Sequence, residues 1–396
     1  MEHPLQRLWN KPERLVIGFM SGTSADGVDA ALVRISGYGV ETRLTTQLAF
    51  CFTPFDEATR AEVLRLAGGG SAAAADFCRI NFHLGQLYCE AGDALCRQAG
   101  IERAQVDLIG CHGQTLWHIP QEEIYLGRSQ HSTFQLGESA MLAEYFGCPT
   151  VGDFRVRDVA AGGLGAPLVP YTEFLLYRSR EECVALQNIG GIGNVTVLPR
   201  DCRLEDVFAF DTGPGNMLMD ALVERLTNGR QHYDAGGKMA AQGRVDAGLL
   251  AFLMQDPYLQ RKPPKTTGRE AYGAPYLAAL LDYAAAHGVS LLDTLATVTR
   301  FTAECIAYGL QRFSPCRPGR MIVGGGGCYN LTLMAHLRAL LPDCRVMTNE
   351  DLGLDGNAKE AVAFALLADE TIFASCNNAP GATGARHPVV MGKISL

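Results

Sequence analysis

The sequence predicts an α/β protein built of two lobes, because one order of elements occurs twice along the chain. Each half opens with a strand, a glycine turn and a return strand, beginning at Leu15 and at Cys183. Each then continues with a third strand and with alternating helices and strands, which is typical of α/β folds. No identity of residues accompanies the repeat, so it is a repeat of element order. Two such lobes would bring both glycine turns to a central cleft, where small ligands usually bind.

In the first half, the hydrophobic pattern predicts strands at residues 15–20, 28–35 and 44–52. The first is a continuous apolar run, typical of a buried strand, and the third mostly alternates, as a half-buried strand does. Further along we expect helices at 56–66, 72–99 and 138–146, strands at 106–110 and 150–151, and a loop at 111–115.

In the second half, strands are expected at 183–189, 195–198 and 207–210, with the glycine turn at 190–194. The third of these strands is expected to end at Asp211. We also expect helices at 217–226, 274–287, 292–313, 330–341 and 357–367, strands at 320–323 and 345–348, and a glycine turn at 324–327.

Composition excludes several classes of protein. The 396 residues are 47% hydrophobic and 19% charged, which supplies packed cores and argues against disorder. The 34 Lys and Arg against 42 Asp and Glu leave a net charge of −8, and an acidic surface repels nucleic acid. The 13 cysteines form no C-x-x-C pair, so we expect a reducing cytoplasm and neither a disulfide framework nor a zinc site. No apolar run predicts a membrane span, and the polar N-terminus predicts no signal peptide.

The turn at residues 21–27 combines two glycines, hydroxyl residues and one acid. Backbone N–H groups in such turns converge on anions, glycine allows close approach, and Asp26 is a candidate Mg²⁺ contact through water. A plain hairpin turn explains the same residues and is the more common case. The turn is not a Walker loop, because no Gly-Lys-Ser/Thr follows, nor a dinucleotide fingerprint, because a strand follows it.

The segment at residues 211–216 indicates a functional site more specifically than the turn at residues 21–27 does. A carboxylate at a strand end, followed by glycines and a helix start, is a common arrangement for catalytic acids and phosphate contacts. A capping or turn role for Asp211 is the alternative. The four glycines at 324–327 leave room for a nucleobase or ribose against bare backbone, although a flexible loop has the same composition.

A series of motifs, in order, resembles the anhydro-N-acetylmuramic acid kinase family. The first is GFMSGTSADGVD at residues 18–29, and the resemblance runs from near residue 15 to the C-terminus. The others are CHGQT at 111–115, GDFR at 152–155, DVAAGG at 158–163, GAPLVP at 165–170, NIGGIGN at 188–194, FDTGPGN at 210–216, PKTTGRE at 264–270, GGGG at 324–327 and GATGA at 381–385.

The resemblance implies a fold, an activity and cofactors. The fold is two ribonuclease H-like lobes with a central nucleotide cleft, as in actin-like ATPases, with residues 1–148 plus about 375–396 in one lobe and 149–374 in the other. The activity is ATP-dependent phosphorylation of O6 of 1,6-anhydro-N-acetylmuramic acid, with hydrolytic opening of the anhydro bridge, in peptidoglycan recycling. ATP and Mg²⁺ are the implied cofactors and an amino sugar the implied partner; a homodimer, for which helix 274–287 is a candidate surface, is left open.

The resemblance also implies site residues. Asp211 matches the catalytic base, since water attack at C1 needs a carboxylate, and Glu360 matches a second carboxylate near that water. Without the resemblance, Glu360 would be a solvated helix residue. The ATP-binding candidates are Gly22, Thr23, Ser24, Ala25, Asp26, Gly27, Val28, Asp29, Gly190, Gly191, Asn194, Gly213, Gly215, Asn216, Gly325 and Gly326.

The substrate-binding candidates are His112, Gln114, Arg155 and Asp158, and each has a structural alternative. His112 and Gln114 suit sugar hydroxyls or the lactyl carboxylate, and equally well a role in satisfying loop backbone. Arg155 suits the same carboxylate, while a salt bridge to Asp158 or a neighbouring acid is the competing explanation. Lys265 suits ligand contact or a solvated loop.

Two departures from the family pattern bear on substrate preference. Leu164 occupies a position that usually carries Gln, and the segment 121–132 looks longer than in many members. Two other functions are weighed: a kinase of the same fold acting on an ordinary hydroxyl, which needs no water at C1, and a nucleotide-gated chaperone or filament protein. The second is weakened because no added domain or exposed apolar strand set is predicted.

Overall fold

The computed structural model describes residues 3–69, 71–263 and 265–396, and the chain divides into two compact units. Unit 1 comprises Met1–Leu176 and Asn357–Leu396, and unit 2 comprises Tyr177–Gly356. The divisions differ from the expected boundaries at 148/149 and 374/375. The reason is packing, because helices between 154 and 176 and the helix after 357 make their contacts within the first unit.

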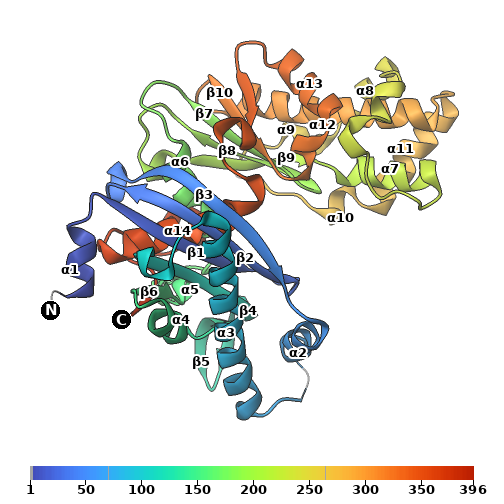
Figure 1. Cartoon of the computed structure of the whole chain (residues 1–396). Coiled ribbons are helices and arrows are strands. Elements are labelled where there is room, and N and C mark those ends of the chain that lie inside the picture. Colours follow the sequence, from blue (N-terminus) through green and yellow to red (C-terminus); the bar gives the residue numbers. More distant parts are fainter. Residues whose placement is uncertain (1–2, 70, 264) are drawn as a thin grey trace. The chain divides into compact units, whose positions relative to one another are not determined.

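Unit 1 contains a mixed sheet in the order β12-β6-β4-β1-β2-β3 (Figure 1). Strands β1, β2 and β3 form an antiparallel meander, and β1, β4 and β6 are parallel. β12 pairs antiparallel with β6, and β5 pairs with β4. The strands are β1 (Glu13–Ser21), β2 (Gly27–Ser36), β3 (Arg43–Pro54), β4 (Leu108–Tyr125), β5 (Arg128–Leu136), β6 (Thr150–Gly152) and β12 (Lys393–Ser395).

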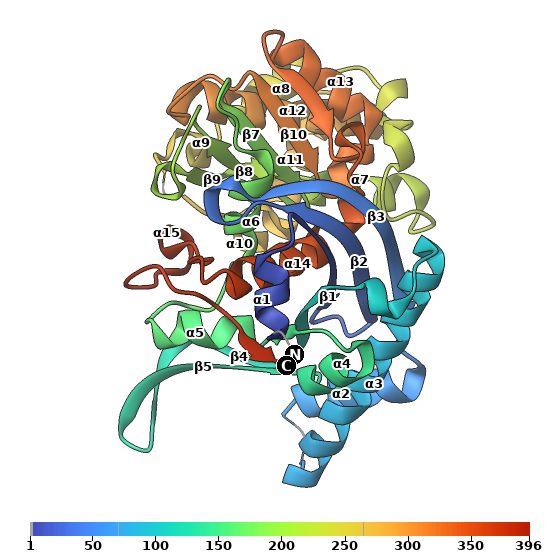
Figure 2. The same ribbon diagram turned by 60° about the vertical axis from the view of Figure 1, so that its left-hand side comes forward.

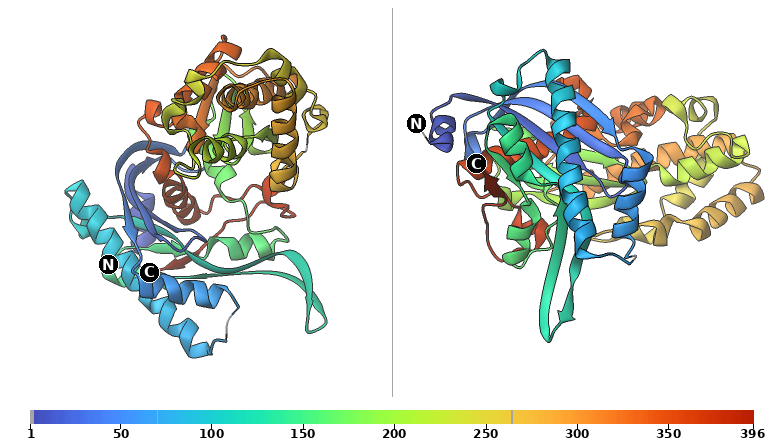
Figure 3. Two further views of the ribbon diagram at one scale, coloured as in Figure 1. Left: turned by 90° about the vertical axis from the view of Figure 1, so that its right-hand side faces the viewer. Right: turned by 60° about the horizontal axis from the view of Figure 1, so that its bottom comes forward.

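Helices cover both faces of this sheet (Figure 3), and β1 is buried from Arg14 to Ser21. Its alternate residues Ile17 and Phe19 pack in the core that includes α3, and Gly18, between them, faces α14. The helices of unit 1 are α1 (Pro4–Trp9), α2 (Glu57–Ala67), α3 (Ala74–Ala99), α4 (Ser139–Phe146), α5 (Phe154–Ala160), α6 (Val169–Tyr177), which ends at the junction, α14 (Lys359–Ile372) and α15 (Pro380–Thr383).

The strand expected at 106–110 is much longer than predicted. β4 runs through the expected loop at 111–115 and on to Tyr125, and it forms a ribbon with β5 that extends from the rest of unit 1 (Figure 2). The segment 121–132 forms the far part of this ribbon. Ile124, Tyr125 and Leu126 at its end are 73%, 59% and 87% exposed.

Unit 2 repeats the order of five neighbouring strands of unit 1, β6-β4-β1-β2-β3. Its sheet is β11-β10-β7-β8-β9, with β7, β8 and β9 antiparallel and β7, β10 and β11 parallel. The predicted α/β class and the repeated plan are therefore confirmed. The strands are β7 (Val184–Ile189), β8 (Ile192–Leu198), β9 (Phe208–Pro214), β10 (Arg320–Gly324) and β11 (Arg345–Thr348).

Unit 2 has its own apolar core beneath the long helix α12. Ser290 caps this helix by accepting a hydrogen bond from the backbone N–H of Asp293. The helices are α7 (Met217–Thr227), α8 (Ala247–Leu253), α9 (Pro257–Gln260), α10 (Arg269–Tyr272), α11 (Ala274–Ala286), α12 (Leu291–Phe313) and α13 (Leu331–Leu340). In the described part of the chain, no helix combines the length and apolar character needed to cross a membrane.

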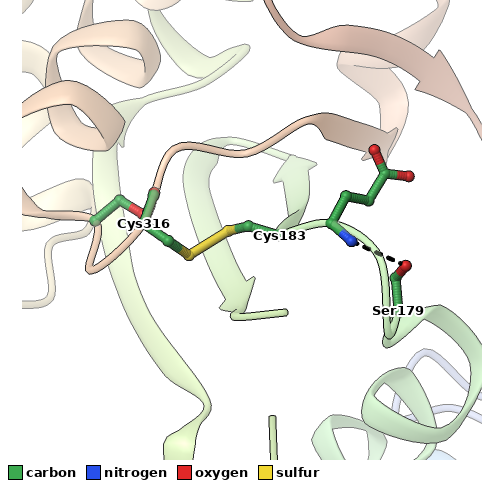
Figure 4. Close-up of a disulfide and its surroundings, with 5 residues drawn as sticks. Ser179, Cys183 and Cys316 are labelled. Atoms are coloured by element: carbon green, nitrogen blue, oxygen red, sulfur yellow. Dashed lines mark hydrogen bonds between the residues drawn. A yellow bond between two sulfur atoms is a disulfide. The ribbon is translucent and has the colours of Figure 1, made fainter. Parts of the chain in front are cut away.

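One disulfide corrects the expectation that the cysteines would be unbridged. Cys183 and Cys316 are bonded, with Cα atoms 6.5 Å apart (Figure 4). The pairing is a tertiary effect, because the backbone N–H of Gly319 bonds to the carbonyl of Cys183 and brings the two segments together. The other cysteines of the described chain are free, so no disulfide framework is present.

Candidate functional site

The turn between β1 and β2 in unit 1 is held by two buried polar side chains. The Ser21 hydroxyl lies 2.8 Å from the carbonyl oxygen of Gly27 and 2.5 Å from Gln114 Oε1. Gln114 Nε2 in turn donates to the carbonyl of Gly22 at 2.9 Å. The turn therefore has a fixed shape, while the Thr23 and Ser24 side chains remain exposed.

The two glycines of this turn have different physical roles. A Cβ on Gly22 would meet only Ser24 Oγ, at 3.7 Å, so the space above Gly22 is open to a ligand. A Cβ on Gly27 would lie 2.3 Å from the carbonyl oxygen of Thr53. Gly27 is therefore required by strand packing. Of the two glycines, only Gly22 leaves room for a ligand to approach the backbone closely, as the sequence predicts.

Three carboxylates lie near one another at this end of unit 1. Asp26 and Glu360 are exposed, whereas Asp29 is half-buried. Burial, and then the charges of Glu360 and Asp26, raise the pKa of Asp29 to about 6. Among the described residues no group of three or more His, Cys, Asp or Glu side chains is arranged to hold a metal ion directly. Asp26 is exposed, so its carboxylate is open to contact with a hydrated Mg²⁺ ion.

Helix α14 presents Glu360 because its backbone packs directly on the sheet. A Cβ on Gly18 of β1 would lie 1.8 Å from the carbonyl oxygen of Ala361, and one on Gly110 of β4 would lie 2.1 Å from that of Phe364. Only glycine permits this approach. Glu360 directly precedes Ala361 in the first turn of α14. The close packing of the helix on the two glycines therefore fixes the position of Glu360.

The buried His112 is hydrogen-bonded to the half-buried Arg155. Arg155 Nε donates to His112 Nε2 at 2.9 Å, and His112 Nδ1 donates to the carbonyl of Gly113 at 2.7 Å. Burial, and then the charge of Arg155, lower the pKa of His112 to about 3. His112 is therefore neutral and occupied on both nitrogens. Arg155 Nη1 also donates to the carbonyl of Gly165 at 2.7 Å.

Gln114 and Asp158 are also occupied by the protein. Gln114 is 1% exposed and holds the turn described above. Asp158 is fully buried; its carboxylate accepts hydrogen bonds from the backbone N–H of Gly165 and from the side chains of Asn378 and Thr383, at 2.8–2.9 Å. Gln114 therefore satisfies loop backbone, which is the structural alternative given for it. The partners of Asp158 are an amide N–H and two neutral side chains, and not the arginine of its structural alternative.

In unit 2 the turn between β7 and β8 packs on the start of α7. The backbone N–H of Gly215 donates to the carbonyl of Gly191 at 2.9 Å, and that of Asn216 donates to Gly190 at 2.7 Å. These two donors, expected to meet phosphate, are therefore used within the unit. A Cβ on Gly215 would lie 2.2 Å from the carbonyl oxygen of Gly190, so this glycine is needed for the packing itself.

The other glycines of unit 2 that were predicted to bind ATP differ in their exposure to solvent. Gly191, Gly325 and Gly326 are exposed, and Gly325 has a φ of +78° with no room for a Cβ beside Ile189. Gly213 is buried in β9. The exposed three are the ones open to a ligand.

Asp211 lies inside β9, not at its end as expected, because β8 continues to pair with the strand as far as Pro214. Asn194 is its neighbour on β8, which brings two of the predicted residues together. Asp211 is half-buried, and Oδ2 accepts a hydrogen bond from the backbone N–H of Thr267 at 2.9 Å. Burial raises the pKa of Asp211, although the Thr267 N–H and the charge of Lys265 oppose that rise.

Lys265 is buried, so the alternative of a solvated loop is wrong for this residue. It is 6% exposed, and its ammonium lies 4.6 Å from the ring centroid of Tyr258 and 4.7 Å from that of Phe313. The motif at 264–270 marked this segment as part of the family resemblance, but no local sequence pattern indicates that Lys265 is buried. Pro264 of that motif lies outside the described residues.

Comparison with known proteins gives consistent matches. The family model described as anhydro-N-acetylmuramic acid kinase matches residues 14–396. A protein of that name from Caldanaerobacter subterraneus subsp. tengcongensis is 50% identical over 99% of this chain and 99% of its own length. Those from Clostridioides difficile and Bacillus cereus strain G9842 are 42% and 44% identical over 96% of this chain and 97% and 99% of their own lengths.

Proposed function

Because the chain belongs to the anhydro-N-acetylmuramic acid kinase family, we propose that it phosphorylates O6 of 1,6-anhydro-N-acetylmuramic acid with ATP while water opens the anhydro bridge. The product would be N-acetylmuramic acid 6-phosphate, formed in peptidoglycan recycling and amino-sugar catabolism. The family resemblance and the enzyme class expected from the sequence, a kinase, are confirmed by the match.

The proposed reaction balances without a separate base for O6. The bond from C1 to the bridging oxygen breaks, that oxygen attacks the γ-phosphorus of ATP, and ADP leaves. Water adds to C1, and its proton passes to a carboxylate. Only this last step demands a protein base.

Asp211 is the proposed base. Its position in the FDTGPGN motif supports this assignment, and so does its half-buried carboxylate, whose pKa is raised by burial. A raised pKa makes a carboxylate a stronger proton acceptor. Glu360 is proposed as the second carboxylate, and its exposure in the first turn of α14 is compatible with that role.

The phosphate groups of ATP are proposed to lie against the turn at residues 21–27. The exposed hydroxyls of Thr23 and Ser24 and the open space over Gly22 support this. In unit 2 the exposed glycines Gly325 and Gly326 are the proposed nucleotide contacts. Mg²⁺ would be held by Asp26 through water, and when bound it neutralises phosphate charge.

Arg155 remains the proposed substrate residue among the four candidates in unit 1. Its guanidinium is anchored by His112 and by the carbonyl of Gly165. Burial lowers the pKa of Arg155, and the Glu360 charge opposes that effect, so the guanidinium lies near the proposed second carboxylate. His112, Gln114 and Asp158 are proposed to hold this region in shape.

The observation that carries the proposal is a family match over residues 14–396 that includes Asp211 in its motif. The test is incubation with Mg·ATP and the anhydro sugar in ¹⁸O-labelled water, with product identification by mass and NMR. We expect the label on C1 and the phosphate on O6. Unlabelled C1, or phosphorylation of reducing sugars only, would point to a kinase acting on an ordinary hydroxyl.

The matched variant is Asp211→Asn, which keeps the size and the hydrogen bond from Thr267 but cannot accept the proton. We expect turnover to fall by about 10³-fold or more, with ATP affinity within about twofold of wild type. Near-normal turnover by this variant would remove Asp211 from the mechanism.

A further inference from the structure

One short segment of unit 2 contacts Asp211 at both its backbone and its side chain. The backbone N–H of Asp211 donates to the carbonyl of Lys265 at 3.1 Å, and the backbone N–H of Thr267 donates to Asp211 Oδ2 at 2.9 Å. The segment 265–267 therefore lies along β9 at the position of the carboxylate.

Lys265 anchors this segment by an unusual burial. Its ammonium lies over the rings of Tyr258, Phe313 and Phe210, at 4.6, 4.7 and 5.7 Å from their centroids. It also lies 3.4 Å from the carbonyl oxygen of Tyr258. In the described chain no salt bridge joins Lys265 to a carboxylate. Burying a cation in this way costs free energy, so stability alone does not account for it.

A third contact completes the arrangement. The Tyr258 hydroxyl donates to the carbonyl oxygen of Asp211 at 2.9 Å, and the same ring packs on Lys265. The N–H, the C=O and Oδ2 of Asp211 are thus all engaged. Within the described residues Oδ1 has no hydrogen-bond partner, and the side chain is partly exposed.

We propose that Lys265 and Thr267 are positioning residues for Asp211: the caged lysine anchors the segment, and the Thr267 N–H holds Oδ2 so that Oδ1 is presented to the attacking water. This inference rests on the proposed function, since it assigns a support to the proposed base. It predicts that the segment controls both the orientation and the protonation of the carboxylate.

The protonation effect has a definite sign. The titratable groups that face Asp211 are Lys265, from the segment, and Tyr258, from α9; its neighbour on β8, Asn194, does not titrate. The Thr267 N–H and the Lys265 charge both lower the pKa of Asp211. Removing either one should therefore move the acid limb of the kcat/KM profile to higher pH.

The matched pair of variants is Thr267→Pro and Thr267→Ala. Proline removes the N–H donor, whereas alanine keeps it. Alanine removes the Cγ2 methyl and Oγ1, and Oγ1 is buried without a hydrogen-bond partner among the described residues. For Thr267→Pro we expect kcat to fall about 10- to 100-fold and the acid limb to rise by about one pH unit, with KM for ATP unchanged. Thr267→Ala should stay within about twofold of wild type.

Lys265→Met provides a second test that does not depend on proline. It replaces the buried cation with an apolar chain of similar length, so the protein should fold at least as well as wild type. We expect lower kcat and an acid limb at higher pH, with an unfolding temperature that does not fall. ¹³C NMR titration of the Asp211 carboxyl, in protein without substrate, reads the same pKa independently of turnover.

The outcomes separate this inference from the proposed function. If the carboxyl titration moves in Thr267→Pro and Lys265→Met but the rate profile does not, the positioning holds and the base is another residue. If neither the titration nor the rate moves while Asp211→Asn is inactive, the base assignment stands and the positioning inference is overturned.

Discussion

At the scale of single residues, contacts decide which polar side chains are available for chemistry. His112 and Gln114 were predicted as substrate contacts, with backbone satisfaction as the alternative. The structure engages both within unit 1. A sequence motif shows that a polar residue is needed at a position but not which neighbour uses its hydrogen-bonding groups.

His112 leads to a prediction about pH. Its pKa is about 3 in the folded chain and ordinarily 6.5, so below pH 6.5 the unfolded chain binds a proton that the folded chain does not. Stability from this group is complete above pH 6.5 and is lost as the pH falls toward 3, by about 1.4 kcal/mol per pH unit. Urea unfolding at pH 7, 6 and 5 should show a smaller loss in His112→Gln than in wild type.

The control for this prediction is His387→Gln, because His387 is exposed. It should lose stability with falling pH as wild type does. Parallel curves for wild type and His112→Gln would show that His112 is not the group responsible.

At the scale of elements, the most consequential packing is that of α14 on β1 and β4. The sequence predicts the strand and the helix, but it contains no sign that Gly18 and Gly110 allow their backbones to touch. The same holds for the ribbon of β4 and β5. The residues 111–115 were predicted as a loop, but Cys111 pairs with β1 and β6, and Gln114 and Thr115 pair with β5. Long-range pairing, which local pattern does not encode, decides both cases.

Gly18→Ala tests the packing of α14. The added Cβ would meet backbone at 1.8 Å, which side-chain rotation cannot relieve, so we expect a loss of about 3 kcal/mol in the free energy of unfolding. Kinase activity should fall as well, since Glu360 lies in the first turn of this helix.

Gly381→Ala is the matched control in unit 1, because a Cβ there would meet nothing within 4 Å. Its free energy of unfolding should be unchanged or slightly raised. Equal stability of Gly18→Ala and Gly381→Ala in urea titrations would contradict the close approach.

At the scale of the whole molecule, the two units share one strand order while their glycine turns differ in use. The turn of unit 1 is held by Ser21 and Gln114, and that of unit 2 is occupied by the start of α7. The repeat of element order was visible in the sequence, but these different partners were not. The disulfide of unit 2 was likewise missed, because its cysteines are 133 residues apart.

This disulfide gives a prediction at the same scale. By the chain-entropy argument, closing a loop of 133 residues stabilises unit 2 by up to about 5 kcal/mol. Oxidised protein should unfold at a higher temperature than protein treated with dithiothreitol, and peptide mass mapping should find Cys183 joined to Cys316. Cys376→Ser, which changes an exposed free cysteine, should leave this difference intact. A free Cys183 in oxidised protein would contradict the bond.

The sequence by itself determined the α/β class, the repeated plan, most strands and helices, and the family, because hydrophobic period and ordered motifs are local properties. Only the tertiary structure decided that Asp158 is enclosed by Gly165, Asn378 and Thr383, and that Lys265 lies among aromatic rings. The partners of these two residues are distant in sequence or are brought close by the path of a loop. Burial and hydrogen bonding depend on where such segments meet, and no local pattern of residues records that.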